Sequence, residues 1–396
     1  MDWGRLGMPN EQTLNSIYED MVGWRRHLHR NPELSFQEFE TSKMIAELLS
    51  SWGLDVRTGV AGTGVVAMLV GGKPGRSIAL RADIDALPIQ DEKDVPYQST
   101  VPGIMHACGH DGHTSELLGV AKYYSQHREE TAGTRVFLFQ PGEEFLPGGA
   151  APMIAAGALE GVDAVFGVHL WSPMPYGTAG ARPGPFMASP DEFEIEIIGR
   201  GGHAGLPHEC ADALVAGAAL VTALQSIVSR NVNPLESGVL SIGRFNAGKA
   251  NNVIAERCVI GGTIRTFTPE LRAFMKRRLE EIVKHTCELY GCEFNLQFVL
   301  GYPPVVNDEA ETSRWFRVAG EVLPEGIIHS ERVMAGEDFS YYLQRKPGCF
   351  FFVGAGAADG TSAAHHHPRF DIDERAMLIA ARLLIAVADD AADSQN

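Results

Sequence analysis

The chain has 396 residues, of which 45% are hydrophobic and 21% are charged. A chain of this length exceeds the usual size of a single hydrophobic core, and its composition excludes a disordered protein, so we expect two folded domains. The formal net charge of −17 would repel nucleic acids and anionic membranes, so we expect a small-molecule partner, no nucleic acid and no membrane.

The first residues, MDWGRLGMPNEQ, are polar and lack the basic start and apolar run of a signal peptide. No stretch approaches the ~18 consecutive apolar residues of a membrane span. The six cysteines are scattered without a CxxC pair, which favours a reducing compartment. We therefore expect a soluble, cytoplasmic protein.

The first part of the chain alternates helical and strand patterns. Buried apolar runs separated by a helix indicate an α/β fold with a mixed, mostly parallel sheet sandwiched by helices. Helices are predicted over 11–29, 41–51 and 115–125, and strands over 64–70, 77–81, 135–139 and 164–168.

The middle of the chain changes character, because residues 192–198 alternate EFEIEII with period two, as in a strand with one solvent-facing side. The patterns then follow a βαββαβ order, which suits an α+β domain with a four-stranded antiparallel sheet covered by two helices. The later elements are predicted as helices over 211–228 and 270–290 and strands over 239–245, 258–266 and 293–300.

After residue 302 the α/β character returns, with helices predicted over 311–322 and 374–388 and a strand over 349–353. The predicted architecture is one α/β domain made of residues 1–186 and 302–396, with a smaller domain, 187–301, inserted into it. The tail, residues 389–396, is predicted to be disordered.

Polar side chains with metal-binding chemistry follow the apolar strands, where open α/β sheets place their ligand sites. They are Asp83, Asp85, Gln140, Glu143, Glu144, His169, His365, His366 and His367, together with Cys108, His110 and His113 in the segment HACGHDGHT. Carboxylates, imidazoles and a thiolate that converge on one sheet edge are what a polynuclear metal site requires. A coincidence of surface histidines and caps is the better interpretation of any one histidine, but not of the set.

Cys108 taken alone can be an inert buried thiol or a nucleophile that needs a histidine. Its CxH spacing to His110 and the nearby carboxylates favour a metal thiolate. Glu143 and Glu144 are adjacent, so if one binds a metal, the other can accept a proton from metal-bound water.

Seven segments, taken in order, resemble the aminoacylase and carboxypeptidase type of metallopeptidases. They are RADIDALP (81–88), MHACGHDGHT (105–114), QPGEE (140–144), GVHL (167–170), GRGGHAGLPH (199–208), GEDFSYY (336–342) and HHPRFDIDE (366–374), and the similarity begins at HRNPELSFQEFET (29–41). The nearest branch contains hippurate hydrolases, auxin-conjugate hydrolases and N-acyl-amino-acid deacetylases. The resemblance implies metal-dependent hydrolysis of N-acyl amino acids to a carboxylic acid and a free amino acid.

The resemblance also implies two divalent metal ions per subunit, zinc or manganese, with cobalt or nickel also compatible with a Cys/His/Glu ligand set. Cys108 would bridge the two metals. Glu144 and His366 would complete one site, and His110 and His169 the other.

Glu143 would be the general base that deprotonates the bridging water and later protonates the leaving amine. Asp85 would orient a ligand imidazole from outside the ligand set. Asp83 stands where related branches place a metal-binding histidine, so it is assigned support rather than ligation. His367 replaces a common Ser or Asn, and His366 is preferred as the ligand.

The inserted domain is expected to be a lid and dimerisation domain. His203 resembles the histidine that reaches across a homodimer interface to polarise the substrate carbonyl, although a cap of the adjacent helix is the alternative. Asn252 and Arg265 resemble groups that hold substrate oxygens or the substrate carboxylate, and a salt-bridged strand residue is an equal alternative for Arg265. Gly205 and Ala255 replace a common Ala or Ser and a common Pro, and neither change removes a ligand.

Two rival functions remain at this point. A dipeptidase or carboxypeptidase would share the same site with a different pocket. A catalytically silent binding protein would have lost Glu143 or a ligand, and none is missing from the sequence.

Overall fold

The computed structural model describes residues 9–357 and 362–393, and the chain divides into two compact units. Unit 1 comprises Met1–Gly184, Val306–Glu331 and Asp338–Asn396, and unit 2 comprises Pro185–Val305 and Arg332–Glu337. The predicted inserted domain, 187–301, does not include residues 332–337, whereas the structure groups them with unit 2. Val333 N–H donates to the carbonyl of Phe186 at 3.0 Å, so this short segment is held within unit 2.

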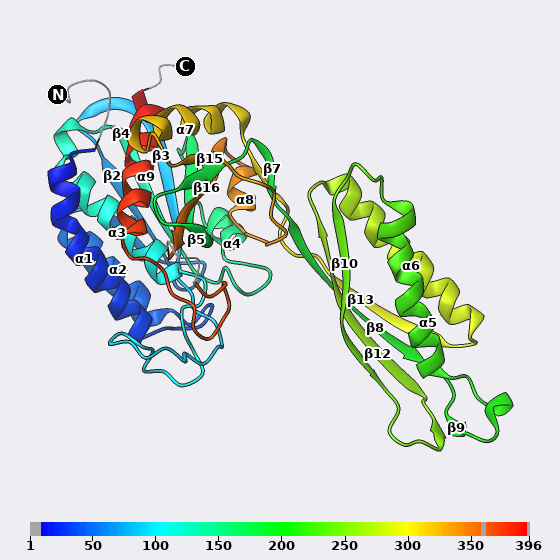
Figure 1. Ribbon diagram of the computed structural model, residues 1–396. Coiled ribbons are helices and arrows are strands. Elements are labelled where there is room, and N and C mark those ends of the chain that lie inside the picture. The colour runs from blue at the N-terminus through cyan, green and yellow to red at the C-terminus, as the bar shows by residue number, and fades with distance from the viewer. Residues whose placement is uncertain (1–8, 358–361, 394–396) are drawn as a thin grey trace. The chain divides into compact units, whose positions relative to one another are not determined.

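Unit 1 is built on an eight-stranded sheet with helices packed against it (Figure 1). Its strands are β1 (Asp55–Val60), β2 (Gly64–Val70), β3 (Lys73–Asp83), β4 (Ala132–Gln140), β5 (Ala164–Pro175), β6 (Ala179–Ala181), β15 (Ile327–His329) and β16 (Gly348–Gly356). Its helices are α1 (Glu11–Arg30), α2 (Phe39–Ser51), α3 (His110–Gln126), α4 (Ala150–Ala155), α7 (Glu309–Val322), α8 (Ser340–Leu343) and α9 (Ala376–Asp393), with a 3-10 turn at Arg128–Glu130.

The central strands of this sheet are parallel. The order is β1-β2-β4-β3-β5-β16-β6-β15, and β3 pairs in parallel with both β4 and β5, as β5 does with β16. Strand β16 is buried along its whole length because its two faces are covered. The ring centroid of Phe350 lies 4.9 Å from that of Phe339, and that of Phe351 lies 5.1 Å from that of Trp315 in α7. The predicted mixed, mostly parallel α/β fold is confirmed.

Helix α3 begins at His110, five residues before the predicted start. Gly109 has φ 96°, a left-handed conformation that glycine adopts without strain, and it turns the chain into the first helical turn. His110 and His113 therefore lie three residues apart on the same side of the helix. The helix carries part of the polar segment to the sheet edge.

The predicted disorder of residues 389–396 is wrong for the part that the structure describes. Helix α9 continues through this segment because its acidic residues have buried partners. Arg135 donates to Asp389 at 2.7 Å, and Arg314 donates to Asp390 at 2.6 Å. The last three residues, 394–396, lie outside the described residues.

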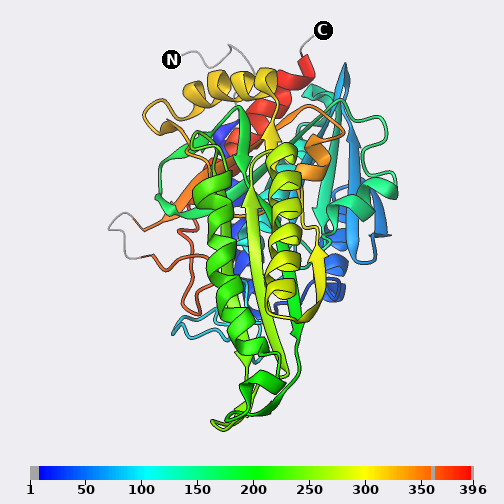
Figure 2. The ribbon, with the colours of Figure 1, turned by 90° about the vertical axis from the view of Figure 1, so that its right-hand side faces the viewer.

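Unit 2 contains a four-stranded antiparallel sheet with two helices side by side on one face (Figure 2). The sheet order is β10-β12-β8-β13. The elements are β8 (Ser189–Ile198), α5 (Ala213–Ser226), β10 (Gly238–Ala247), β12 (Arg257–Thr266), α6 (Pro269–Leu289) and β13 (Glu293–Val299). Shorter elements of unit 2 are β9 (Gly202–His203), a 3-10 turn at Pro207–Glu209, a π turn at Ile227–Asn231 and β11 (Val253–Ile254), while β7 (Gly184–Met187) and β14 (Val305–Asn307) lie where the chain passes from one unit to the other.

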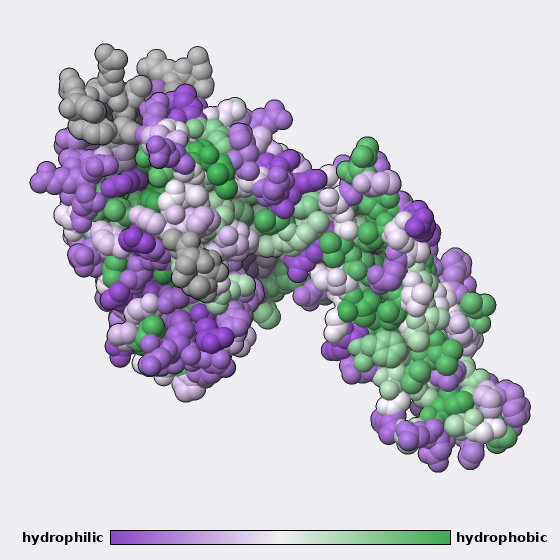
Figure 3. All heavy atoms as spheres, viewed as in Figure 1, coloured by the Kyte–Doolittle hydropathy of each residue, from purple (hydrophilic) through white to green (hydrophobic). Residues whose placement is uncertain are grey.

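Helix α5 has one face on the sheet and one apolar face in contact with solvent. Ala216, Leu220 and Leu224 are buried, whereas Leu214 and Val215 are 41% and 45% exposed. Figure 3 shows hydrophobic residues gathered on this side of unit 2. The helical span Ala213–Asn231, which is α5 together with the π turn after it, is long and apolar enough to cross a membrane, but a helix packed on a sheet has the same composition, so this is weak evidence.

Substitution Phe137→Ala in β4 should lower the free energy of unfolding by about 3–5 kcal/mol, since it leaves a cavity in a close-packed core. Phe137 has no exposed surface, whereas Phe39 at the start of α2 is 66% exposed. Phe39→Ala is the matched control and should change stability by less than about 0.5 kcal/mol. Urea unfolding measures both, and equal effects would contradict the placement of Phe137.

Candidate metal centre

The metal-type side chains of unit 1 gather near the carboxyl ends of β3, β4 and β5. Asp83 ends β3, Glu143 and Glu144 follow β4, and His169 lies within β5. Parallel strands present their carboxyl ends at one edge of a sheet, so residues far apart in sequence meet there. Cys108 and His110 join them from the start of α3, and His366 from the segment before α9.

Two groups of potential ligand atoms share the sulfur of Cys108. One group is Cys108, His110 and His169, and the other is Cys108, Glu144 and His366. Within each group all the atoms lie within 4.8 Å of one another. Cys108 Sγ lies 3.5 Å from His169 Nε2, and His366 Nε2 lies 3.2 Å from Glu144 Oε1. One thiolate shared by two sets of donors suits a pair of neighbouring divalent cations.

Two glycines with positive φ shape the backbone of the site. Gly109, at φ 96°, separates Cys108 from His110 and brings both side chains into the same group. Gly142, at φ 64°, precedes Glu143, and a Cβ on it would lie 2.4 Å from the ring of Phe36. Only glycine fits this second position, because any side chain there would collide with Phe36.

Hydrogen bonds orient the two buried imidazoles. His110 Nδ1 lies 3.0 Å from the carbonyl oxygen of Asp85, and His169 Nδ1 lies 3.0 Å from that of Leu170. A carbonyl can only accept, so Nδ1 carries a proton in each ring, and Nε2 is the nitrogen that could face a cation. The Nε2 of His110 is buried and makes no hydrogen bond with the described residues. A metal cation would give this nitrogen a partner, so these residues fit a metal site.

Asp83 and Asp85 are both engaged by protein groups. Asp83 accepts from His113 Nδ1 at 2.6 Å, and Asp85 accepts from Ser35 Oγ at 2.6 Å and from Glu144 N–H at 3.0 Å. Asp83, His110 and His113 also form a group of potential donors. His113 Nε2, however, accepts the N–H of Leu170 at 2.9 Å, so neither ring nitrogen of His113 is available to a cation.

Carboxylates dominate the electrostatics of the site. Burial raises the pKa of the Cys108 thiol, and Glu144 and Glu143 raise it further. Burial alone would lower the pKa of His110, but Asp83 and the other nearby carboxylates raise it to about 10. Negative groups gathered this closely favour any positive charge among them, either a proton or a metal cation.

His365 is a further neighbour of the site, directly before the predicted ligand His366. Its Nε2 accepts the N–H of Ser172 at 3.2 Å, so the protonated Nδ1 faces Cys108 Sγ at 3.8 Å. Its ring stacks on Trp171 with the centroids 4.6 Å apart. The run of three histidines contains no spacing that tells the sulfur-facing ring from the other two.

The other predicted residues, His203, Asn252 and Arg265, lie in unit 2 and are described separately. His203 is exposed at the end of β9, and its Nδ1 accepts the N–H of Gly205 at 2.9 Å. The exposed Asn252 precedes β11, which pairs with β9. Arg265 is half-buried in β12, and burial lowers its pKa.

The proposed alternative for His203, a cap of the adjacent helix, is wrong. Asp212 caps α5, because its carboxylate accepts the N–H groups of Leu214 and Val215. His203 is thus left without a role in the helix, and its exposed ring is available to a ligand or another chain.

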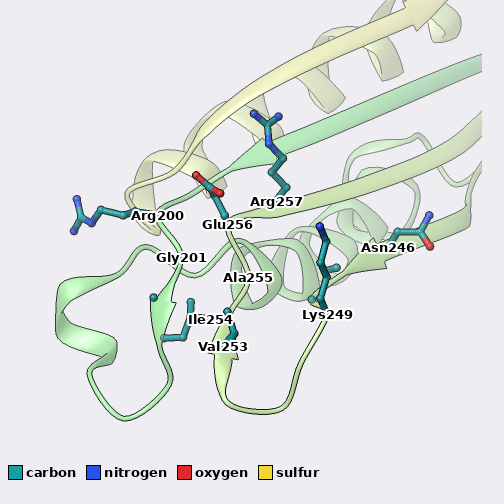
Figure 4. Close-up of a pocket in the computed structure, with 12 residues that line it drawn as sticks. Arg200, Gly201, Asn246, Lys249, Val253, Ile254, Ala255, Glu256 and Arg257 are labelled. Carbon is teal, nitrogen blue, oxygen red and sulfur yellow. The ribbon is translucent and has the colours of Figure 1, made fainter.

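A cavity of about 560 Å³ lies beside β9 and β11 in unit 2 (Figure 4). Its lining includes Arg200, Gly202, Lys249, Val253, Glu256 and Arg257. Arg257 is paired with Glu196, and Arg200 Nε donates to a backbone carbonyl. A hydrogen bond to a carbonyl leaves Arg200 charged, so Arg200 and Lys249 both contribute positive charge to the lining.

The whole chain is similar to known amidohydrolases and peptidases. A model described as peptidase family M20/M25/M40 matches residues 79–390. N-acyl-L-amino acid amidohydrolase of Geobacillus stearothermophilus is 49% identical over 302 residues, 76% of this chain and 82% of that protein. N-acetyl-L-cysteine deacetylase of Bacillus subtilis is 43% identical over 389 residues, 98% and 92% of the two chains. The crystal structure of a Bacillus subtilis protein described as a dinuclear metal binding peptidase of the M20 family has 36% identity and a TM-score of 0.82, covering 95% of this chain and 98% of that one.

His106, next to the metal-type donors, should make stability depend on pH. Both its ring nitrogens are buried and make no hydrogen bond with described residues, and burial lowers its pKa to about 4. In the unfolded chain His106 takes up a proton near pH 6.5, but in the folded chain it does so only near pH 4. The contribution of His106 to the free energy of unfolding is therefore constant above pH 6.5 and falls as the pH drops towards 4.

The difference in unfolding free energy between the wild type and His106→Leu should therefore change by about 1.4 kcal/mol per pH unit within that window. Urea unfolding between pH 4.5 and 8 measures it. A difference that does not vary with pH would show that His106 is not buried as a neutral ring.

Proposed function

Because the chain belongs to peptidase family M20/M25/M40, the family that its motifs resemble, we propose that it hydrolyses the amide bond of N-acyl amino acids. The products are a carboxylic acid and a free amino acid. The observation that carries the proposal is the pair of donor groups that share Cys108 beside the buried Glu143. The names of two close relatives, an N-acyl-L-amino acid amidohydrolase and an N-acetyl-L-cysteine deacetylase, support this substrate class.

Five side chains would hold two divalent cations, zinc or manganese, with cobalt or nickel also compatible with the donors. They would be Cys108 with His110 and His169, and Cys108 with Glu144 and His366. Such cations, when bound, lower the pKa of a water molecule and polarise the amide carbonyl. His365 faces the sulfur with a proton and would stabilise its thiolate form.

Glu143 would accept the proton of the attacking water and pass it to the amide nitrogen as the C–N bond breaks. Its side chain is 7% exposed and groups with His110 and Glu144. A buried carboxylate beside the donor groups is well placed for this transfer. Asp83 and Asp85 would support the ligand imidazoles, Asp85 by holding His110 through Nδ1.

His203 would complete the site from the partner subunit of a homodimer. His203 would donate a hydrogen bond to the developing oxyanion, a contribution of ~3 kcal/mol for one donor. Asn252 and Arg265, also in unit 2, would hold substrate oxygens or the substrate carboxylate. We infer these roles from the motifs in which the three residues lie. His203 and Asn252 are exposed, as residues that contact a substrate must be before it binds.

The lid and dimerisation role of unit 2 is supported by one of its surfaces. Strand β10 is an edge of the sheet, and Phe245 in it is 41% exposed. A Cβ on Gly217 of α5 would lie 3.2 Å from this ring, so helix and edge strand form one surface with Leu214 and Val215. An apolar helix face next to an open strand edge suits a symmetric contact with a second copy.

The expected compartment is the cytoplasm, since all six cysteines are free. The rival activity, a dipeptidase or carboxypeptidase on the same scaffold, would use the same donors. Comparing an N-acetyl amino acid with a dipeptide of the same amino acid distinguishes the two.

The purified enzyme should hydrolyse N-acetyl amino acids, lose activity with a chelator and regain it with a divalent cation. Glu143→Gln should keep its metal and lose about 10²–10⁴-fold in kcat, the range for a general base. Glu144→Gln is the matched neighbour and should lose metal, as measured by elemental analysis. Metal loss in Glu143→Gln alone would reverse the two roles, and full activity after chelation would refute the proposal.

Glu143→Gln and His203→Ala proteins should each be inactive and should regain activity after mixing and subunit exchange. Each mixed dimer would contain one site with both intact residues, if His203 acts on the partner's site. Exchange is verified with differently tagged subunits. Two variants that stay inactive after verified exchange would exclude a role for His203 across the dimer.

A further inference from the structure

A short segment, Ser35–Glu38, reaches the metal-type site from outside the donor groups. Ser35 Oγ donates to Asp85 at 2.6 Å, and the ring of Phe36 fills the space that a side chain on Gly142 would need. Phe36 itself has φ 62°, an uncommon conformation for a residue with a large side chain, so this contact is held against local strain.

Glu38 contacts the backbone directly before Glu143. Its side chain is fully buried, and its Oε1 accepts the N–H of Gly142 at 2.9 Å. Its other oxygen, Oε2, accepts a hydrogen bond from Thr63 Oγ1. Both carboxylate oxygens are therefore engaged, and Glu38 belongs to none of the potential metal-ligand groups of the described residues.

The turn that carries Glu143 is thus held on both sides by buried carboxylates. Glu38 holds the N–H of Gly142, and Asp85 holds the N–H of Glu144 at 3.0 Å. Asp85 also contacts His110, so its loss would disturb a ligand. Glu38 contacts the backbone just before Glu143 and no ligand side chain, so its contribution can be separated from metal binding.

We propose that Glu38 is a positioning residue for Glu143, which it aims by fixing the N–H of Gly142. The inference rests on the proposed function, in which Glu143 is the general base. Gly142 lacks a side chain that would restrict its backbone, and a proton-transfer group must be held within about 0.5 Å of its productive position. A buried carboxylate costs free energy that an apolar side chain of the same size would not, which fits a residue kept for positioning.

Glu38→Gln keeps an acceptor oxygen for Gly142 N–H, and its amide group can donate to Thr63. Glu38→Met has a similar size and no strong acceptor. In the metal-loaded enzyme we expect kcat of Glu38→Met to fall about 10- to 100-fold, in line with the cost of a small misplacement, with KM and metal content unchanged. Glu38→Gln should stay within about twofold of the wild type.

Thr63→Val is the matched control, because it removes the other hydrogen bond of Glu38 at the same buried place. It should leave kcat within about twofold. If Glu38→Met fails to fold, Glu38→Asp tests the same point, since its carboxylate is one methylene too short for Gly142 N–H. Its kcat should fall with its metal retained, and a wild-type kcat in Glu38→Asp or a folded Glu38→Met would overturn the inference.

The double variant Glu38→Met/Glu143→Gln separates this inference from the proposed function. If Glu38 acts through Glu143, the double variant should be no slower than Glu143→Gln alone. A further loss of 10-fold or more would show that Glu38 acts by another route. A Glu143→Gln protein with full kcat would instead refute the general base, and with it the proposed function.

Discussion

The site depends on holding several acidic side chains close together away from water. Like charges at this spacing repel strongly because the protein screens them less than water does. Arg81 offsets part of this cost. It donates to Asp83 and to Asp338 at 2.7 Å each, and it is almost fully buried. The imidazoles offset more, and two divalent cations would offset the rest, so metal binding and the stability of this sheet edge are expected to be linked.

A second guanidinium connects the start of α3 with the segment before α9. Arg25 in α1 is fully buried and donates to Asp111 at 2.9 Å and to Asp371 at 2.6 Å. Asp111 follows His110, and Asp371 lies five residues after His366. Arg25 thus connects the segments that carry His110 and His366, which suits a site that needs fixed geometry.

The sequence predicted the sheet class and the identity of the potential ligands because these follow from patterns that act locally or along one strand. Apolar runs end where the donors begin, and motif spacing separates Cys108 from His110. The prediction failed where the conformation of a segment depends on contacts with residues far away in the sequence. The acidic segment that begins at Asp389 has the composition of a disordered tail, but in the folded protein Arg135 donates a hydrogen bond to Asp389. The choice among three adjacent histidines depends on backbone directions, such as the φ of 64° at His366, which no residue pattern encodes.

The chemistry of the donors also limits where the substrate's carboxylate can bind. An N-acyl amino acid carries a free carboxylate, and the groups around Cys108 are acids, imidazoles and a thiol, which repel an anion or bind a cation. The buried cation of this neighbourhood, Arg81, is already committed to two carboxylates. Under the proposed function, a cation that recognises the substrate carboxylate would come from elsewhere, and Arg265 is the candidate in unit 2. The side chains of unit 2 would then influence the choice of substrate while the donors of unit 1 stay the same.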